Sequence, residues 1–222
     1  LLRARYRRVM RIAVHPRLQR GGLGRRMLEF LAQTAGGDLL ATSYGATADL
    51  VRFWRACGFM PARLGLRRDA ASGSHSLIML RAISAAGQEL QESAHARFHA
   101  LLPLLLLSEL DELESDIVSE LLLNPSAGEP LSSTQQERLR RFVQHGLPPD
   151  TVVPELDAAV RHAAACGTLG KLPQQQRALL VELVLQRKRP QQVVRSVGLG
   201  GRSEMLSLLS RTIGDLLSAS RG

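Results

Sequence analysis

The spacing of apolar residues changes once along this 222-residue chain, near residue 83. Before that point, the alternation typical of strands and the three-to-four-residue spacing typical of helices follow one another in the order β-α-β-α-β-β. This order indicates an α/β unit. Strands are predicted over 9–14, 39–43, 59–66 and 76–80, and helices over 25–34 and 48–57.

After residue 83 only helical spacing remains, so residues 84–222 are predicted to form an all-α region. Two helices are expected within 85–123, divided near Pro103, because proline cannot continue the backbone hydrogen bonding of a helix. The stretch "NPSAGEP" at 124–130 is predicted to be a linker. Further helices are expected over 173–188, 190–197 and 202–219.

Three local signals predict helix ends in this region. Ser132 precedes Gln135 by three residues, which is the spacing of a capping box. Gly146 would end the helix that this box begins. Asp150 is predicted to cap the segment that runs to Cys166.

The charge changes at the same place as the periodicity. Residues 1–83 contain 15 arginines, no lysine and four acidic residues, a net charge of +11, whereas residues 84–222 carry −2. A domain this basic indicates a polyanionic partner such as RNA or a phosphorylated cofactor, although an ordinary arginine-rich surface is the alternative. Candidate phosphate contacts lie in Arg3–Arg8, where Arg3, Arg5 and Arg7 would share one strand face, and in Arg187–Pro190.

Several classes of protein are disfavoured. Two cysteines, Cys57 and Cys166, are too few for a disulfide scaffold and fit a reducing compartment, so a cytoplasmic location is expected. The longest apolar run, Leu101–Leu107, is too short to span a membrane, and the charged start lacks the apolar stretch of a signal peptide. No membrane partner and no metal are expected.

A glycine-rich loop lies between the first predicted strand and the first predicted helix. The stretch Gln19–Gly24 reads Q-R-G-G-L-G, which fits the pattern Q/R-x-x-G-x-G/A. Glycine permits a sharp turn close to a ligand, and the unpaired N–H groups of the following helix attract anions. The loop lacks the lysine and hydroxyl of a P-loop, and Met27 stands where a dinucleotide fingerprint needs glycine. A plain structural turn is the alternative.

This strand–loop–helix arrangement resembles the acetyl-coenzyme A loop of the GNAT acetyltransferase superfamily, which implies a partial GNAT-type fold. The resemblance implies that the strand residues Ile12, Ala13 and Val14 pair with the pantetheine arm. It also implies that the loop holds the pyrophosphate through Gln19, Arg20, Gly21, Gly22, Leu23, Gly24 and Arg25.

Three stretches narrow the resemblance. "RIAVHP" (11–16), "SYGATADLVRFWRACGF" (43–59) and "RRDAASGSHSLIML" (67–80) are similar to the tRNA(Met) cytidine acetyltransferase family. That family transfers acetyl from acetyl-coenzyme A to the N4 amine of the wobble cytidine in elongator methionine tRNA, using ATP. The resemblance implies the C-terminal part of the acetyltransferase domain over 1–83 and a tRNA-binding helical tail over 84–222.

The family also carries acidic and arginine cofactor contacts near the helix that contains "RFW". Asp49 stands at the acidic position. The arginine that often precedes "CGF" is absent, because that position is Ala56 and the nearest arginine is Arg55. The resemblance implies Asp49 and Arg55 as further cofactor contacts.

Two side chains near the loop have alternative roles. His15 would lie near the thioester, where a neutral imidazole could accept the proton lost by the attacking amine, or it could only fix the bend before Pro16. Tyr44 is expected to lie in the core or stack on substrate rather than protonate a leaving thiolate. Phe53 and Trp54 are expected to pack in the core.

Two more groups are expected to be inert. Cys57 is predicted to be a small buried side chain, because direct acetyl transfer needs no acyl-enzyme. His95 and His99 have the i, i+4 spacing of metal ligands, but no third ligand is nearby, so a solvated helix face is expected.

The family's helicase-type ATPase module and the first strands of the superfamily fold are not in this sequence. The chain is therefore interpreted as the C-terminal part of a longer protein or as a degenerate relative, inactive on tRNA by itself. Two other functions are kept: an acetyltransferase of protein or small-molecule amines, and a non-catalytic RNA-binding fragment. The helix–glycine–helix spacing at 193–209 hints weakly at a helix-turn-helix.

Overall fold

The computed structural model describes residues 4–124 and 128–219, which leaves Arg3 and part of the expected linker outside the described residues. The chain divides into two compact units between Leu101 and Leu102. Each unit is described by itself. The predicted change near residue 83 coincides with the end of the last strand at Ala82.

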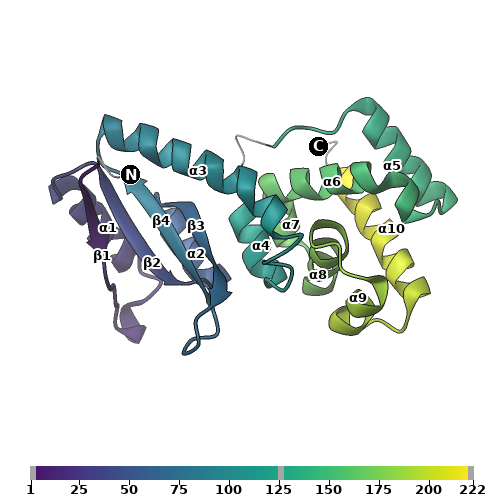
Figure 1. The fold of residues 1–222 in the computed structure, drawn as a ribbon, viewed down its shortest axis with the longest axis horizontal. Coiled ribbons are helices and arrows are strands. Elements are labelled where there is room, and N and C mark those ends of the chain that lie inside the picture. The colour runs from purple at the N-terminus through teal and green to yellow at the C-terminus, as the bar shows by residue number, and fades with distance from the viewer. Residues whose placement is uncertain (1–3, 125–127, 220–222) are drawn as a thin grey trace. The chain divides into compact units, whose positions relative to one another are not determined.

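The first unit is a mixed α/β unit built on one four-stranded sheet (Figure 1). Its strand order is β1-β2-β4-β3, with β1 parallel to β2 and the other neighbours antiparallel. The elements are β1 (Tyr6–Val9), α1 (Leu23–Thr34), β2 (Leu39–Gly45), α2 (Ala48–Ala56), β3 (Met60–Arg68), β4 (His75–Ala82) and most of α3 (Ala85–Leu105), whose residues from Leu102 on belong to the second unit. The predicted β-α-β-α-β-β order is confirmed.

The two faces of β2 pack against different helices, because successive side chains of a strand point to opposite faces. Leu39 and Ala41 form a cluster with Leu80 that packs against apolar side chains of α3. Tyr44, which lies on the other face, stacks on Trp54 of α2 with ring centroids 5.9 Å apart. Helices therefore cover both faces of the central strand.

The strand predicted over 9–14 is wrong in its position. The first strand ends at Val9, which pairs with Thr42, and the following residues up to His15 have no regular structure. The β-branched residues Ile12 and Val14 favour an extended backbone, but a strand also needs a neighbour. β2 continues to Gly45 without β1 beside it.

The second unit consists of helices packed on one another. Its fully buried core includes Leu179, Leu180, Val181, Leu209 and Ile213. Its α-helices are α4 (Ser115–Leu122), α5 (Ser133–His145), α6 (Val153–Ala165), α7 (Thr168–Lys171), α8 (Gln174–Leu180), α9 (Pro190–Val197) and α10 (Arg202–Ala219). The last turn of α8 continues into a π-helical segment over Val181–Leu185.

The capping box at the start of α5 is confirmed. The Ser132 hydroxyl accepts from the Gln135 amide N–H at 3.2 Å, and the Gln135 side chain accepts from the Ser132 N–H at 2.9 Å. Gly146 ends the helix with φ 63°, as predicted. These signals lie within a few neighbouring residues, so the sequence alone is enough to predict both ends of the helix.

One helix-end prediction is wrong and another is confirmed. Asp150 lies inside a short 3₁₀ turn over Pro149–Val152, and α6 begins after Val152 without a side-chain cap. The division expected near Pro103 is confirmed, because α3 ends soon after this proline, at Leu105, and α4 begins at Ser115. A proline so close to the end of a helix removes only one backbone hydrogen bond, so it need not end the helix there. No helix in the described ranges has the length and apolar composition that a bilayer crossing requires.

Candidate functional site

The glycine-rich loop brings the main chain to the start of α1. A 3₁₀ turn over Pro16–Leu18 reverses the chain after the extended stretch. Gly22 then adopts φ 76° at the N-cap of α1, a backbone conformation that suits glycine. No side chain caps this helix start. Its first N–H groups therefore face outward as hydrogen-bond donors, with the positive end of the helix dipole behind them.

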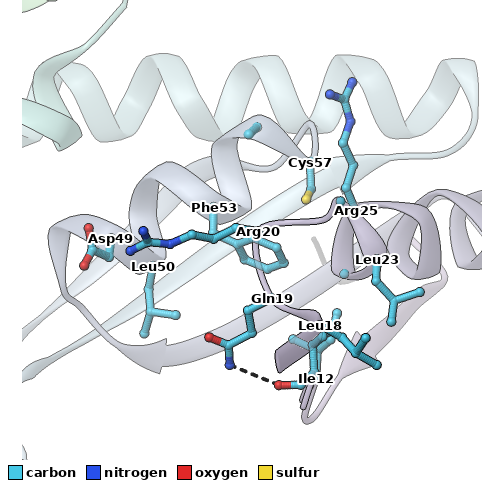
Figure 2. Close-up of a pocket in the computed structure, with 14 residues that line it drawn as sticks. Ile12, Leu18, Gln19, Arg20, Leu23, Arg25, Asp49, Leu50, Phe53 and Cys57 are labelled. Carbon is cyan, nitrogen blue, oxygen red and sulfur yellow. Dashed lines mark hydrogen bonds between the residues drawn. The ribbon is translucent and has the colours of Figure 1, made fainter. Parts of the chain in front are cut away.

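A cavity of about 590 Å³ lies between this loop, α1 and α2 (Figure 2). Nine of the residues proposed for cofactor binding line it: Ile12, Val14, Gln19, Arg20, Gly22, Leu23, Gly24, Arg25 and Asp49. Ala13, Gly21 and Arg55 do not line it. The loop and the start of α2, which are separated in sequence, thus meet at one pocket.

Sequence reasoning missed several lining residues on α2. Leu50, Phe53, Ala56 and Cys57 line the cavity beside Asp49. Their spacing from Asp49 follows the 3.6-residue period of a helix, so all lie on one face. A helical projection from Asp49 would have found them.

Gly24 is needed for the close approach of α1 to α2. A Cβ atom at this position would lie 3.3 Å from two ring carbons of Phe53 and 3.7 Å from a methyl group of Val14. The first contact is tighter than ordinary van der Waals packing. A larger side chain would push into the wall of the cavity, which gives the second glycine of the motif a packing role.

The extended stretch beside the cavity keeps most of its backbone groups free. The Gln19 side chain donates from Nε2 to the Val14 carbonyl oxygen at 3.0 Å and so ties the loop to this stretch. Among the described residues, no hydrogen bond involves the main chain of Arg11, Ile12 or Ala13. These N–H and C=O groups can pair with an elongated ligand as a neighbouring strand would.

The electrostatics of the cavity are predominantly positive. Arg20 and Arg25 line it from the loop and from α1, whereas Asp49 is the only acidic residue among the described residues of its lining. The Asp49 carboxylate is 91% exposed and forms an ion pair with Arg52 at 2.5 Å. An anionic ligand would therefore meet unbalanced positive charge together with the N-terminus of α1.

Arg55 and Ala56 lie differently from what the sequence comparison implied. Ala56 lines the cavity, while Arg55 lies near His95 and His99 of α3, whose pKa values are lowered mainly by burial and further by the Arg55 charge. One residue turns a helical side chain by about 100°, so Arg55 cannot occupy the direction of position 56. The geometry does not favour Arg55 as a contact of a ligand in this cavity.

His15 lies on the surface next to the cavity but is not part of its lining. Its Nδ1 accepts a hydrogen bond from the Arg17 main-chain N–H at 3.3 Å, at the start of the 3₁₀ turn. In a neutral ring, this leaves the proton on Nε2. The contact supports the structural alternative, in which His15 fixes the bend.

Of the aromatic and thiol side chains near α2, Phe53 and Cys57 line the cavity, whereas Tyr44 and Trp54 do not. Trp54 is 4% exposed and packs edge-on against Phe53 and Phe59. The Tyr44 hydroxyl donates to the Met79 sulfur at 2.8 Å, and burial raises the pKa of this phenol. Burial likewise raises the pKa of the Cys57 thiol, which disfavours the reactive thiolate.

The expected solvated face for His95 and His99 is wrong. Both rings are half-buried and meet edge-to-face with centroids 4.4 Å apart. His95 Nδ1 lies 3.1 Å from the Pro61 carbonyl oxygen, so α3 presses this pair against β3. Over the ranges that the structure describes, no three His, Cys, Asp or Glu side chains are grouped to hold a metal ion.

Comparison with known proteins identifies relatives along nearly the whole chain. Residues 34–84 match the family model described as GNAT acetyltransferase 2. The chain is 35% identical over 221 residues to the tRNA(Met) cytidine acetyltransferase TmcA of Nitrosococcus halophilus, with 95% of this chain and 29% of the relative covered. The same-named protein of Vibrio cholerae is 36% identical over 183 residues, with 82% of this chain and 24% of the relative covered. The same-named protein of Pyrococcus furiosus is 33% identical over 188 residues, with 81% of this chain and 23% of the relative covered.

These matches confirm the resemblance drawn from the sequence. The chain is homologous to one segment of the tRNA(Met) cytidine acetyltransferases, and its first unit contains part of a GNAT acetyltransferase fold. It spans less than a third of the length of these relatives.

Proposed function

We propose that this homologue of a segment of the tRNA(Met) cytidine acetyltransferases binds acetyl-coenzyme A in the cavity between α1 and α2 and serves the acetylation of cytidine in tRNA. The observation that carries the proposal is the uncapped start of α1, with Gly22 at its N-cap, opening into a positively charged cavity of about 590 Å³. A phosphorylated carrier fits such a site.

The residues present fit the two chemically distinct parts of the carrier. The pyrophosphate would be held by the N–H groups at the start of α1, with Arg20 and Arg25 adding charge. The pantetheine arm would pair with the free main chain of Ile12 and Ala13. Bound in this way, the carrier supplies a thioester-activated acetyl group.

The chain's own contribution to the reaction is to bind and orient. The backbone stretch and the loop would fix the acyl carrier along one line, because both are tied together by the Gln19–Val14 hydrogen bond. Leu50 and Phe53 would shield the apolar part of the carrier from water. His15, held by the Arg17 N–H, is given a positioning role in this proposal rather than that of a general base.

The finer substrate assignment rests on the relatives and on the resemblance. Relatives are named for cytidine acetylation of tRNA(Met), and N4 of the wobble cytidine is the acceptor that the family resemblance implies. The excess of positive charge in residues 1–83, +11, suits an RNA substrate. ATP dependence is expected from the resemblance only, and these 222 residues contain no P-loop sequence.

Calorimetric titration of the chain with acetyl-coenzyme A tests the cofactor site. In Gly22→Glu, a carboxylate replaces hydrogen at the proposed pyrophosphate site, so we expect at least about tenfold weaker binding. Gly73→Glu is the matched control, because Gly73 also has positive φ and open space around it but lies in the β3–β4 turn.

Equal affinities for wild type, Gly22→Glu and Gly73→Glu would contradict the assignment of the loop. Absence of binding to the wild-type chain would contradict the proposed function itself. Circular dichroism spectra of both variants should match the wild type, so that a loss of affinity reports on the site rather than on folding.

A further inference from the structure

One ion pair joins α1 to the sheet beside the proposed cofactor cavity. Arg81 of β4 donates from Nη2 to Oε2 of Glu29 on α1 at 2.7 Å, although the two residues are 52 positions apart in the sequence. The Arg81 side chain is 16% exposed, whereas that of Glu29 is 51% exposed. The arginine is therefore held by the fold, while the carboxylate has room to turn toward another partner.

Gly58 makes room for the Arg81 side chain at the end of α2. Gly58 has φ 82°, and a Cβ atom there would lie 3.3 Å from Arg81 Nε and 3.5 Å from Arg81 Cδ. A larger residue would press against the arginine. The Arg81 side chain is thus fixed next to the position of Cys57, which lines the cavity.

Arg25 lies four residues before Glu29 on α1 and lines the same cavity. Figure 2 shows Arg25 beside Cys57, and the charges of Arg81, Arg25 and Glu29 all act on this thiol, whose pKa is raised by burial. Residues four apart on a helix can form an ion pair. Within the described ranges, however, Arg25 has no ion pair, and Glu29 pairs with Arg81 instead.

We propose that Arg81 is a positioning residue that occupies Glu29 and so keeps Arg25 free for an anionic group of the acyl carrier. The inference rests on the proposed function, which assigns Arg25 to the pyrophosphate. Without Arg81, the Glu29 carboxylate would compete with the carrier for Arg25. An exposed arginine–carboxylate pair is weak, so this competition lowers the affinity for the carrier rather than abolishing binding.

Two simpler roles of Arg81 would also weaken binding when the residue is removed. The ion pair could fasten α1 in place, or the positive charge could attract the carrier from a distance. In the first case, loss of Glu29 should be as harmful as loss of Arg81. In the second, loss of Arg81 should be harmful whether or not Arg25 is present.

Calorimetric titration of variants with acetyl-coenzyme A separates these roles, at low ionic strength because salt screens exposed charges. Arg81→Gln should bind about threefold to fivefold more weakly than the wild type. The double variant Glu29→Gln/Arg81→Gln should stay within about 1.5-fold of the wild type, because no carboxylate is left to compete. Arg25→Gln should bind about tenfold more weakly, and adding Arg81→Gln to it should change the affinity by less than about 1.5-fold.

Two further variants complete the test. Arg63→Gln removes the same charge from an exposed position of β3 without an ion pair among the described residues, so it should leave the affinity within about 1.5-fold of the wild type. Glu29→Gln alone should bind at least as tightly as the wild type. Because this side chain is half exposed, the single variant gives a result even if Arg81→Gln does not fold.

The inference is overturned if Arg81→Gln weakens binding equally with and without Arg25, which would indicate attraction at a distance. It is also overturned if Glu29→Gln alone weakens binding as much as Arg81→Gln, which would indicate that the pair fastens α1. Either result leaves the cofactor site in place. A wild-type chain that binds no acetyl-coenzyme A would overturn the proposed function and this inference together.

Discussion

The two units both contain uncapped helix starts, at α1 and at α6, but they differ in the pairing of their extended backbone. Each unit has a buried glutamine that pairs with main-chain carbonyl oxygens. Gln186 of the helical unit donates from Nε2 to Leu110 and Leu113 at 3.3 and 2.8 Å. Gln91 of the α/β unit donates from Nε2 to Gly58 and Leu80 at 3.1 and 2.7 Å. In the α/β unit, the start of α1 has no side-chain cap, and the main chain of Ile12 has no partner among the described residues. Unsatisfied groups of this kind are costly unless water or a ligand pairs with them.

The difference teaches where to look for function in a chain of two units. The unpartnered groups of the α/β unit lie beside the cavity between α1 and α2, and residues 1–83 carry a charge of +11. The helical unit has a closed apolar core with fully buried side chains such as Leu180 and Ile213. Changes in the α/β unit should therefore alter ligand binding, whereas changes in the helical core should alter stability alone.

The largest expected effect tests whether the units unfold separately. Trp54→Ala removes a 4% exposed ring that contacts Tyr44, Phe53 and Phe59, and it should cost about 3–5 kcal/mol of stability in the first unit. In a calorimetric scan, we expect the transition of the first unit to shift to lower temperature while that of the second stays in place.

Acetyl-coenzyme A identifies which transition belongs to the first unit, because a ligand raises the stability of the unit that binds it. Phe30→Ala is the control, since Phe30 is 67% exposed and its loss should change stability by less than about 0.5 kcal/mol. A single transition that shifts as a whole in Trp54→Ala would break the comparison between the units.

A smaller effect tests the polar contact in the helical unit. Gln186→Ala leaves two buried carbonyl oxygens without their donor, so we expect a loss of about 2 kcal/mol by urea unfolding. The affinity for acetyl-coenzyme A should stay within about twofold of the wild type. Gln144→Ala, at an exposed position of α5, should be nearly neutral. A tenfold change in cofactor affinity for Gln186→Ala would contradict the division of roles.

Local signals explain which parts of the fold could be predicted from the sequence. The predicted bounds of α9 and α10 agree with the structure, because Pro190 begins α9 and Gly198 ends it. The position of the first strand was missed, because the end of its pairing at Val9 depends on a distant strand. Strand pairing is a non-local property that periodicity alone does not contain.

The residues of the candidate site also fall into those that contiguous sequence signals predict and those that depend on contacts between distant segments. The loop from Gln19 to Gly24 was recognisable because its glycines, their spacing and the following helix are contiguous. The contribution of Phe53 and Ala56 was not recognisable in this way, because predicting it requires knowing which face of α2 points toward the loop.

The smallest expected effect concerns the histidine pair of α3, which belongs to the α/β unit. Burial, the neighbouring His95 and the charge of Arg55 lower the pKa of His99 to about 4. A histidine with a lower pKa in the folded than in the unfolded protein binds fewer protons when folded. Its stabilising contribution is therefore complete above the unfolded value of about 6.5 and is lost as pH falls from there toward about 4.

The free energy of unfolding of the first unit, measured with urea, should therefore be lower at pH 5.5 than at pH 7.5. Only part of the total loss is expected at pH 5.5, because the loss continues until the pH reaches the folded pKa of about 4. His99→Gln, which cannot titrate, should reduce this pH dependence. His145→Gln, at an exposed position of the helical unit, should leave it unchanged. If the His99→Gln variant keeps the full pH dependence of stability, the histidine pair is not its source. These side chains would then not give the α/β unit a pH dependence of its own.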